Sequence, residues 1–288
     1  MTRPTSFDAI TLRPDEFRLL RDLIAARTGV HFGDDGRTQL ERRLRERLLS
    51  LGLSSFGEYG HYLRFNGRAD AEWEEAMELV TTNETYLFRE VYQLRAFRDE
   101  VLPLLAASAK SRRRLWLWSA GCSTGEEVYT LAILIAQSGL FDGWDVRIFG
   151  SDISKRCIAA ARRGIYGQAS FRVTPPEVRR AWFSEHPDGL HVSDRIRAMC
   201  HFGCMNLLDK ERVAVLGRVD AVFCRNVLIY FDAHSRRRVI EMFHERLYPG
   251  GVLFLGHSES LLNVTTAFEL LHLKEDLAYR KPGTGGAP

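Results

Sequence analysis

The sequence predicts an α/β protein with an all-α N-terminal domain and a small antiparallel β-subdomain inserted into the α/β domain. Residues 12–80 carry apolar side chains at helical spacing and show no strand-like alternation. From Leu115 onward, continuous apolar runs alternate with helical patterns, which is typical of buried parallel strands. Residues 164–205 interrupt that alternation. A chain of 288 residues is long enough for about two domains.

The N-terminal part predicts three amphipathic helices. In the first, Phe17, Leu20 and Ile24 recur at helical spacing. In the second, four leucines form one stripe: Leu40, Leu44, Leu48 and Leu51. A third helix is predicted over residues 69–81, and it leads into the segment "TTNETYLFRE".

The C-terminal part predicts a parallel sheet. Its four apolar runs are "LWLWSAG", "DVRIFGSD", "VDAVFCRN" and "GGVLFLGHS". The stretch "LHVSDRIRAMCHFGCMNLL" alternates in polarity, as antiparallel strands do, and we assign it to the inserted subdomain. The final stretch, "AFELLHLKEDLAYRK", predicts two strands around a charged turn.

These patterns divide the chain into successive parts. Residues 1–82 are expected to form the helical domain and residues 83–114 a linker that carries the motif "NETYLFR". Residues 115–281 are expected to form the α/β domain, with the β-subdomain inserted over about residues 164–205, and residues 282–288 a disordered tail.

Composition excludes several classes of protein. The net charge of +3 is too small to argue for nucleic-acid binding. The five cysteines show no paired spacing, and the N-terminus "MTRPTSFDAI" lacks the apolar core of a secretory signal. No apolar run reaches the ~18 residues of a membrane span. We therefore expect a reduced, cytoplasmic protein that is a monomer and does not insert into membranes.

The loop in "LWLWSAGCSTGEEVYTLAILI" indicates the kind of ligand. In doubly wound sheets, ligands bind beyond the carboxyl ends of the strands, and Gly121 and Gly125 allow close approach of the backbone. Glu126 and Glu127 would repel a pyrophosphate at this helix N-terminus. They favour a nucleoside with a cationic tail. S-adenosylmethionine has that chemistry, since it carries a sulfonium and an ammonium and no phosphate.

An acidic residue at the end of the second run supports an adenosyl ligand. Asp152 ends the run "IFGSD", where a carboxylate can accept hydrogen bonds from both ribose hydroxyls. The alternative is purely structural. Glu126 and Glu127 would then favour the helix dipole, and Asp152 would be the N-cap of the next helix.

Seven motifs resemble, in order, those of the CheR-type chemotaxis receptor methyltransferases. They are "NETYLFRE", "WSAGCSTGEE", "SDIS", "ARRGIYG", "NLLD", "FCRNVLIYF" and "FLGHSESL". The resemblance implies a Rossmann-like class I S-adenosylmethionine-dependent methyltransferase domain with an inserted β-subdomain, preceded by an all-α domain. Members of this family methylate glutamate side chains of chemoreceptors, the methyl-accepting chemotaxis proteins, and form glutamate methyl esters.

The same resemblance implies roles for individual residues. The residues expected to bind the cofactor are Asn83, Thr85, Arg89, Glu127, Asp152, Asn206, Leu207, Asn226 and Val227. The resemblance places Tyr230 near the transferred methyl, and the charge of Arg89 would allow it to hold the substrate carboxylate, so both are expected to be catalytic. The structural alternatives are that Tyr230 caps the core and that Arg89 pairs with Glu90 or Asp99. No metal is expected. A glutamate has an ordinary pKa of about 4.3, so it is already ionised at neutral pH and needs no general base.

Substrate docking is predicted on the second helix, from about Thr38 to Leu51. Its leucines face one side, and four arginines lie on the other side and at the flanks: Arg42, Arg43, Arg45 and Arg47. They could attract an acidic receptor helix, or they could be an ordinary solvated helix face. The loop "WFSEHPDGLHVSD" lacks the Gly-x-Gly insertion of members that bind a receptor's C-terminal pentapeptide. We therefore expect no such tethering.

Two short motifs suggest functions other than receptor methylation. "GHSES" suggests a hydrolase, but it lacks the closing glycine of the G-x-S-x-G elbow, and His257 is expected to be structural. Cys200, His201 and Cys204 suggest a metal site, but no second half follows at ligand spacing, so we assign them to the core. A degenerate, non-enzymatic regulatory domain and a methyltransferase for nucleic acids or small molecules are the remaining alternatives. A methyl-transfer assay on receptor fragments separates them.

Overall fold

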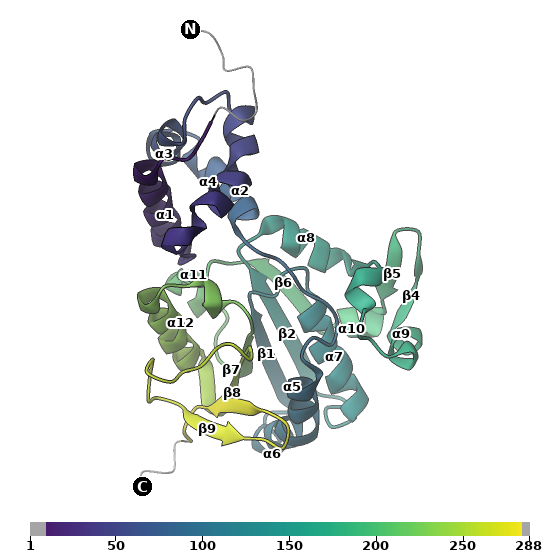
Figure 1. Cartoon of the computed structure of the whole chain (residues 1–288). Coiled ribbons are helices and arrows are strands. Elements are labelled where there is room, and N and C mark those ends of the chain that lie inside the picture. The colour runs from purple at the N-terminus through teal and green to yellow at the C-terminus, as the bar shows by residue number, and fades with distance from the viewer. Residues whose placement is uncertain (1–9, 284–288) are drawn as a thin grey trace. The chain divides into compact units, whose positions relative to one another are not determined.

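The computed structural model describes residues 10–283, which fold into two units (Figure 1). The first unit comprises the chain up to Thr82 together with Tyr230–Arg236. The second comprises Asn83–Ile229 and the chain from Arg237 onward. The tail predicted to be disordered spans residues 282–288. Its residues from 284 onward lie outside the described range.

The first unit is helical, as predicted. Its helices are α1 (Pro14–Thr28), a 3-10 turn (Asp34–Gly36), α2 (Arg37–Ser50), α3 (Phe56–Phe65) and α4 (Ala69–Val80). The predicted leucine stripe of α2 is confirmed, because Leu40, Leu44 and Leu48 are fully buried. Leu51 caps the helix and is only half-buried.

Helix α3 was missed by the sequence analysis. Its sequence, "FGEYGHYLRF", contains two glycines and several aromatic residues, which lower helix propensity. Its start is marked by Ser55, whose side chain accepts a hydrogen bond from the Glu58 N–H. Gly60 is required by packing, since a Cβ there would come within 2.9 Å of Leu19 Cδ2. The glycine that weakens the helix signal is therefore the one that lets α3 pack on α1.

The second unit is built on a seven-stranded sheet with the order β6-β2-β1-β7-β8-β10-β9. The strands are β1 (Arg114–Ala120), β2 (Asp145–Asp152), β6 (Cys200–Cys204), β7 (Val219–Cys224), β8 (Leu247–Leu255), β9 (Glu269–His272) and β10 (Leu277–Arg280). The first five are parallel to their neighbours, and β10 is antiparallel to both β8 and β9. The four predicted parallel strands and the predicted C-terminal pair are confirmed.

The helices of this unit connect the strands. They are α5 (Val91–Ala96), a π-helical turn (Phe97–Val101), α6 (Leu102–Ser108), α7 (Glu126–Ser138), α8 (Lys155–Arg163), α9 (Pro176–Trp182), α10 (Asp194–Arg197), α11 (Lys210–Ala214) and α12 (Ala233–Arg246). Two 3-10 turns, Gln168–Phe171 and Leu228–Tyr230, complete the list. The sheet core includes Phe223 stacked on Phe254 at 4.5 Å between ring centroids, with Phe97 edge-on to both.

The inserted subdomain is smaller than predicted. Strands β3 (Ile165–Tyr166), β5 (Gly189–Val192) and β4 (Phe183–His186) form a separate antiparallel sheet with β5 in the middle. The prediction was wrong for the stretch "CHFGC", which is β6, the parallel edge strand of the main sheet beside β2. An edge strand has one neighbour and is only partly covered, so its polarity alternates like that of an antiparallel strand.

No helix within residues 10–283 is long and apolar enough to cross a membrane.

Candidate cofactor and catalytic site

The order of the strands indicates where a ligand is expected, in a crevice beyond the carboxyl ends of β1 and β7. From the central strand β1 the chain runs outward to β2 and β6 on one side, and the other side begins with the parallel strand β7. This reversal makes β1/β7 the topological switch point, beyond whose carboxyl ends ligands bind in open α/β sheets. The loops after β1, β2 and β7 carry most of the residues that the sequence analysis selected.

The loop after β1 is bent tightly against its neighbours. Gly121 has φ 79°, and a Cβ there would come within 2.4 Å of Val227 Cγ2. Gly125 has φ 93°, and a Cβ there would come within 2.7 Å of Ala161 Cβ. Ser123, at φ 49°, adopts the left-handed region without being a glycine. Both glycines are thus required by close packing against Val227 and Ala161.

Asp152 holds this loop at the end of β2 through a hydrogen bond. Its Oδ2 accepts a hydrogen bond from the Ser123 N–H at 2.8 Å, and its Oδ1 accepts one from the Ser154 N–H at 2.9 Å. It is not the N-cap of α8, because that position belongs to Ser154, whose hydroxyl accepts from Cys157 N–H. Each carboxylate oxygen can accept more than one hydrogen bond. The predicted ribose contact is compatible with this geometry and stays a prediction.

The two adjacent glutamates of α7 have different environments. Glu126 is 3% exposed and accepts hydrogen bonds from Thr124 Oγ1 at 2.6 Å and Ser170 Oγ at 2.9 Å. Burial raises the pKa of Glu126. Glu127 instead accepts from Ser119 Oγ at 2.7 Å and from Arg225 Nη1 at 3.0 Å. Glu126 is therefore held in an internal network, and Glu127 is the one that the family resemblance assigns to the cofactor.

Arg225 joins three separate segments, and the sequence analysis did not select it. Its guanidinium donates to Glu127 Oε2 at 3.0 Å, to Glu90 Oε2 at 2.9 Å and to the main-chain oxygen of Arg89 at 2.7 Å. Burial opposes ionisation of Glu90, but the charge and hydrogen bond of Arg225 outweigh it and lower the pKa of Glu90. The available signal was a charged residue directly after the buried strand β7.

The segment "NETYLFRE" is held in an irregular conformation beside this crevice. Phe88 and Glu90 have φ values of 61° and 57°, which are rare for residues with side chains. The Asn83 carbonyl accepts a hydrogen bond from Ser123 Oγ at 3.0 Å, so this segment reaches the loop after β1. Arg89 Nη1 donates to the Glu84 carbonyl at 2.9 Å. Thr85 is half-buried next to them in sequence.

The remaining predicted cofactor residues follow β6 and β7. The Met205 N–H donates to the main-chain oxygen of Asp152 at 2.8 Å, which places "NLL" beside the end of β2. Asn206 Oδ1 accepts from the Leu208 N–H at 3.0 Å, and Leu207 is buried. Asn226 has φ 60°, and its Oδ1 is buried without a hydrogen-bond partner among the described residues.

Tyr230 belongs to the helical unit, and the site residues on the sheet do not. Its main-chain oxygen accepts a hydrogen bond from the His31 N–H at 2.7 Å, and Val30 forms an isolated bridge with Phe231. The structure therefore groups Asn83, Glu127 and Asp152 with the other crevice residues, and the predicted place of Tyr230 near the transferred methyl stays a prediction.

The four predicted docking arginines are not equivalent. Arg43 donates to the Val80 carbonyl and to Thr82 Oγ1, and so it ties α2 to the end of α4. Arg47 binds the buried carboxylate of Glu72 through Nε and Nη2, with the shortest distance 2.6 Å. Arg45 pairs with Glu41 one turn earlier. Arg42 is exposed. These contacts leave Arg42 as the member of the set that faces solvent most fully.

The two alternative sites have ordinary structural environments. His257 Nε2 lies 3.2 Å from Asp276 Oδ2, which accounts for a structural role. Within the described residues, no group of three or more histidine, cysteine or acidic side chains could hold a metal ion. Cys200 and Cys204 lie on β6, where they are partly buried and pack against the core. The assignment to the core was wrong for His201, which is exposed because β6 is an edge strand.

The crevice residues fit S-adenosylmethionine. An acidic residue, Asp152, ends β2, and the buried Asn226 Oδ1 offers an acceptor without a partner among the described residues. Glu127 and Glu90 supply negative charge shared with Arg225. A cationic amino-acid tail suits this set of groups better than a phosphate does.

Glu126 should make stability depend on pH. Its raised pKa means that the folded state holds the proton more tightly than the unfolded chain, whose pKa is the ordinary 4.5. The stabilisation by that proton is complete below pH 4.5 and is lost as pH rises through the folded pKa. Glu126→Gln has no titrating carboxyl at this position, so it removes this loss of stability at higher pH. Chemical denaturation at pH 4.5 and pH 8 should show the variant gaining stability relative to the wild type at the higher pH. A pH-independent difference would contradict the assignment.

Comparison with known proteins agrees with the geometry. Two family models match the chain: "CheR methyltransferase, all-alpha domain" over residues 15–81 and "CheR methyltransferase, SAM binding domain" over residues 83–277. The chain is 35% identical to chemotaxis protein methyltransferase 2 of Vibrio cholerae, covering 96% of both chains. It is also 35% identical to the chemotaxis protein methyltransferase of Salmonella typhimurium, covering 91% of this chain and 89% of the relative. The predicted fold and cofactor are thereby confirmed. The chain belongs to the CheR methyltransferase family, with the family's all-α domain followed by its S-adenosylmethionine-binding domain.

Proposed function

We propose that this protein methylates glutamate side chains of chemoreceptors and forms methyl esters. The observation that carries the proposal is the environment of Arg89. Its guanidinium is half-buried, lies on the segment fixed by Arg225, and forms no ion pair within the described residues. An arginine held in this way can receive a carboxylate through charge-assisted hydrogen bonds. The names of the relatives support a chemotaxis substrate.

The chemistry needs positioning rather than a base. S-adenosylmethionine supplies an electrophilic methyl group on a sulfonium. The substrate carboxylate is ionised at neutral pH, so the protein has to orient one of its oxygens and exclude water. Orientation of this kind can contribute about 7–11 kcal/mol. Methylation turns the carboxylate into a neutral ester, which no longer attracts Arg89, and this loss of charge favours release of the product.

Two residues divide this work in the proposal. Arg89 holds the carboxylate, and the hydroxyl of Tyr230 orients the reacting groups. The segment around Arg89 is tied to Arg225 and Glu127, so the position of Arg89 depends on the same network that borders the cofactor. The main alternative is a non-enzymatic regulatory role, in which this network would only stabilise the fold.

The test is a methyl-transfer assay with labelled S-adenosylmethionine and a panel of receptor signalling domains. Mass spectrometry should locate the label on glutamates, and mild alkali should release it, because esters hydrolyse and methylamines do not. Arg89→Ala should abolish transfer and keep the fold. Transfer to a different side chain, or cofactor binding without any transfer, would overturn the proposal.

The same assay tests tethering. Strands β4 and β5 are joined by only Pro187 and Asp188, and Gly189 has φ 146°, where a Cβ would come within 2.4 Å of the Tyr166 carbonyl oxygen. This tight turn supports the absence of a peptide-binding loop. Receptors with and without their C-terminal tail should be methylated at equal rates. A large loss of rate on removing the tail would reveal a tether, which acts by raising local concentration.

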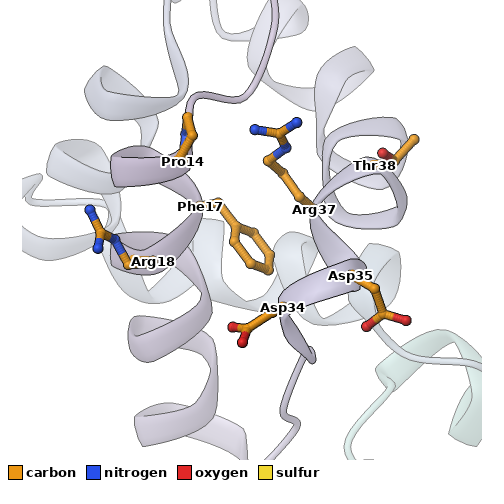
Figure 2. Close-up of a pocket in the computed structure, with 7 residues that line it drawn as sticks. All are labelled: Pro14, Phe17, Arg18, Asp34, Asp35, Arg37 and Thr38. Carbon is orange, nitrogen blue, oxygen red and sulfur yellow. The ribbon is translucent and has the colours of Figure 1, made fainter.

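Docking of an acidic receptor helix is proposed on the exposed face of α2. The helical unit also has a pocket of about 430 Å³ between α1 and the start of α2, into which Phe17 and Arg37 point (Figure 2). Two arginines and two aspartates line that pocket: Arg18, Arg37, Asp34 and Asp35. These charges cancel, so the pocket offers no preference for an acidic partner. Arg42, which is exposed and forms no ion pair within the described residues, is the better candidate.

Arg42→Glu should raise the KM for the receptor about two- to fivefold at low salt, as expected for an exposed interaction of about 0.5–1 kcal/mol. The effect should shrink with added salt, because exposed charges are screened over ~8 Å at physiological ionic strength. Cofactor affinity should stay constant. Arg64→Glu, an exposed arginine on α3, is the matched control. Equal KM values for the two variants would make the α2 face an ordinary solvated surface.

A further inference from the structure

Glu259 holds the loop after β7 through backbone hydrogen bonds. The residue lies in the motif "GHSES", beyond the end of β8. Its Oε2 accepts from the N–H groups of Gly256 at 2.7 Å and Asn226 at 2.8 Å. Its Oε1 accepts from the N–H groups of Val227 at 2.9 Å and Ile229 at 3.2 Å. One carboxylate therefore satisfies four backbone donors from two loops.

The partners of Glu259 are all dipoles. No arginine, lysine or histidine side chain in the described part of the chain forms an ion pair with this carboxylate. Successive backbone N–H groups in a turn make such an anion-binding concavity. The contacts that hold this carboxylate therefore come from backbone N–H donors.

The loop that Glu259 holds is strained. Asn226 has φ 60°, a conformation that costs free energy for a residue with a side chain unless the surroundings impose it. The two loops are also in close contact. A Cβ on Gly256 would come within 2.8 Å of the Asn226 backbone nitrogen. The Glu259 carboxylate and this contact together account for the conformation of Asn226.

That conformation determines what the loop presents to the crevice. The Asn226 Oδ1 is buried without a described partner, and Val227 packs so closely on Gly121 that no side chain fits there. Ile229, the last of the held residues, directly precedes Tyr230. Releasing the loop would displace Asn226 Oδ1 and disrupt the packing of Val227 on Gly121. It would also move the chain that leads to Tyr230.

We propose that Glu259 is a positioning residue for methyl transfer. Its carboxylate holds residues 226–229 in place so that Asn226 Oδ1 can accept a hydrogen bond from the cofactor. It also fixes the position of Ile229, the residue before Tyr230. The first part rests on the family's cofactor, and the second rests on the proposed function. Neither Ser258 nor His257 of the same motif takes part.

The test is Glu259→Gln, which keeps the shape but replaces one acceptor oxygen by an NH₂ group that faces N–H donors. Calorimetry should show the Kd for S-adenosylhomocysteine rising by about tenfold or more, the size expected when charged hydrogen bonds are lost. At saturating cofactor, kcat should fall while the KM for receptor stays constant. Hydrogen exchange of the peptide covering residues 226–229 should speed up. Glu259→Asp, which keeps the charge, should recover part of each effect.

Glu16→Gln is the matched control. Glu16 is also a buried carboxylate that accepts backbone N–H bonds, from Gly57 at 2.8 Å and Arg13 at 3.0 Å, but it lies in the helical unit. The Glu16→Gln substitution should lower the Tm and leave cofactor affinity unchanged. If Glu259→Gln also lowers only the Tm, the positioning role is wrong and the residue is merely structural. If Glu259→Gln does not fold, a Glu259→Asp variant with a lowered Tm but unchanged cofactor affinity and exchange would refute the positioning role.

The cofactor and exchange measurements need no receptor. If the wild type binds cofactor but transfers no methyl to glutamate, the proposed function fails, whereas the effect of Glu259 on Asn226 is still decided by these two measurements.

Discussion

Arg225→Met is expected to lower the free energy of unfolding by about 3–5 kcal/mol, the usual loss when one partner of a buried ion pair is removed. Arg225 is 3% exposed at its side chain and faces two carboxylates, those of Glu90 and Glu127. Methionine fills a similar volume but leaves both charges without a counterion. Chemical denaturation measures the loss, and methyl transfer should fall with it because the Arg89 carbonyl is released.

Arg95→Met is the control for this prediction. Arg95 and Glu275 form an ion pair at 3.8 Å with side chains 50% and 41% exposed, so the loss should be about 0–1 kcal/mol. If Arg225→Met were no more destabilising than Arg95→Met, the buried network would not stabilise the fold. Its role would then be limited to positioning Arg89.

The second large effect is expected for cofactor binding by Asp152→Ala. Removal of a charged acceptor should weaken S-adenosylhomocysteine binding by about 1.5–3 kcal/mol, or about 10- to 150-fold in Kd. Two consequences combine, because the variant loses the predicted ribose contacts and also releases Ser123 and Ser154 from the carboxylate. Asp152→Asn keeps one acceptor oxygen, so its affinity for S-adenosylhomocysteine should lie between those of the wild type and Asp152→Ala.

Asp145→Ala tests whether the effect is local. Asp145 begins β2, the strand that Asp152 ends, and it pairs with Arg147 at the surface. Calorimetry should show wild-type affinity for this variant. Unchanged affinity in Asp152→Ala would remove Asp152 from the site, and equal losses in both variants would point to the stability of β2 instead.

The strands that could be predicted contain continuous buried stretches. This holds for β1, β7 and β8 and for the second half of β2, so their type follows from the sequence. Strand β6 could not be assigned correctly, because an edge strand has an exposed side and its pattern matches an antiparallel strand. Helix α3 was missed for a similar reason, since the close approach of α1 requires a glycine that weakens the helical signal.

The sequence motifs indicate which segments lie near the ends of β1 and β2, but they do not show how neighbouring side chains divide the contacts there. Glu126 and Glu127 differ by about 100° around a helix axis, so one joins a buried network and the other meets Arg225. Nothing local distinguishes them. Arg225 and Glu259 were missed because their partners are remote in sequence. Arg43 and Arg47 likewise look like surface arginines until α4 supplies Val80 and Glu72.

The inserted hairpin differs at its two ends in how freely its sequence can change. At its root, Tyr166 donates to the Thr124 carbonyl and Ser170 donates to Glu126, so a mutation there reaches the loop after β1. At its tip, Pro187 and Asp188 are exposed. A change in the length or sequence of the tip should therefore leave the loop after β1 undisturbed, whereas a change at the root should not.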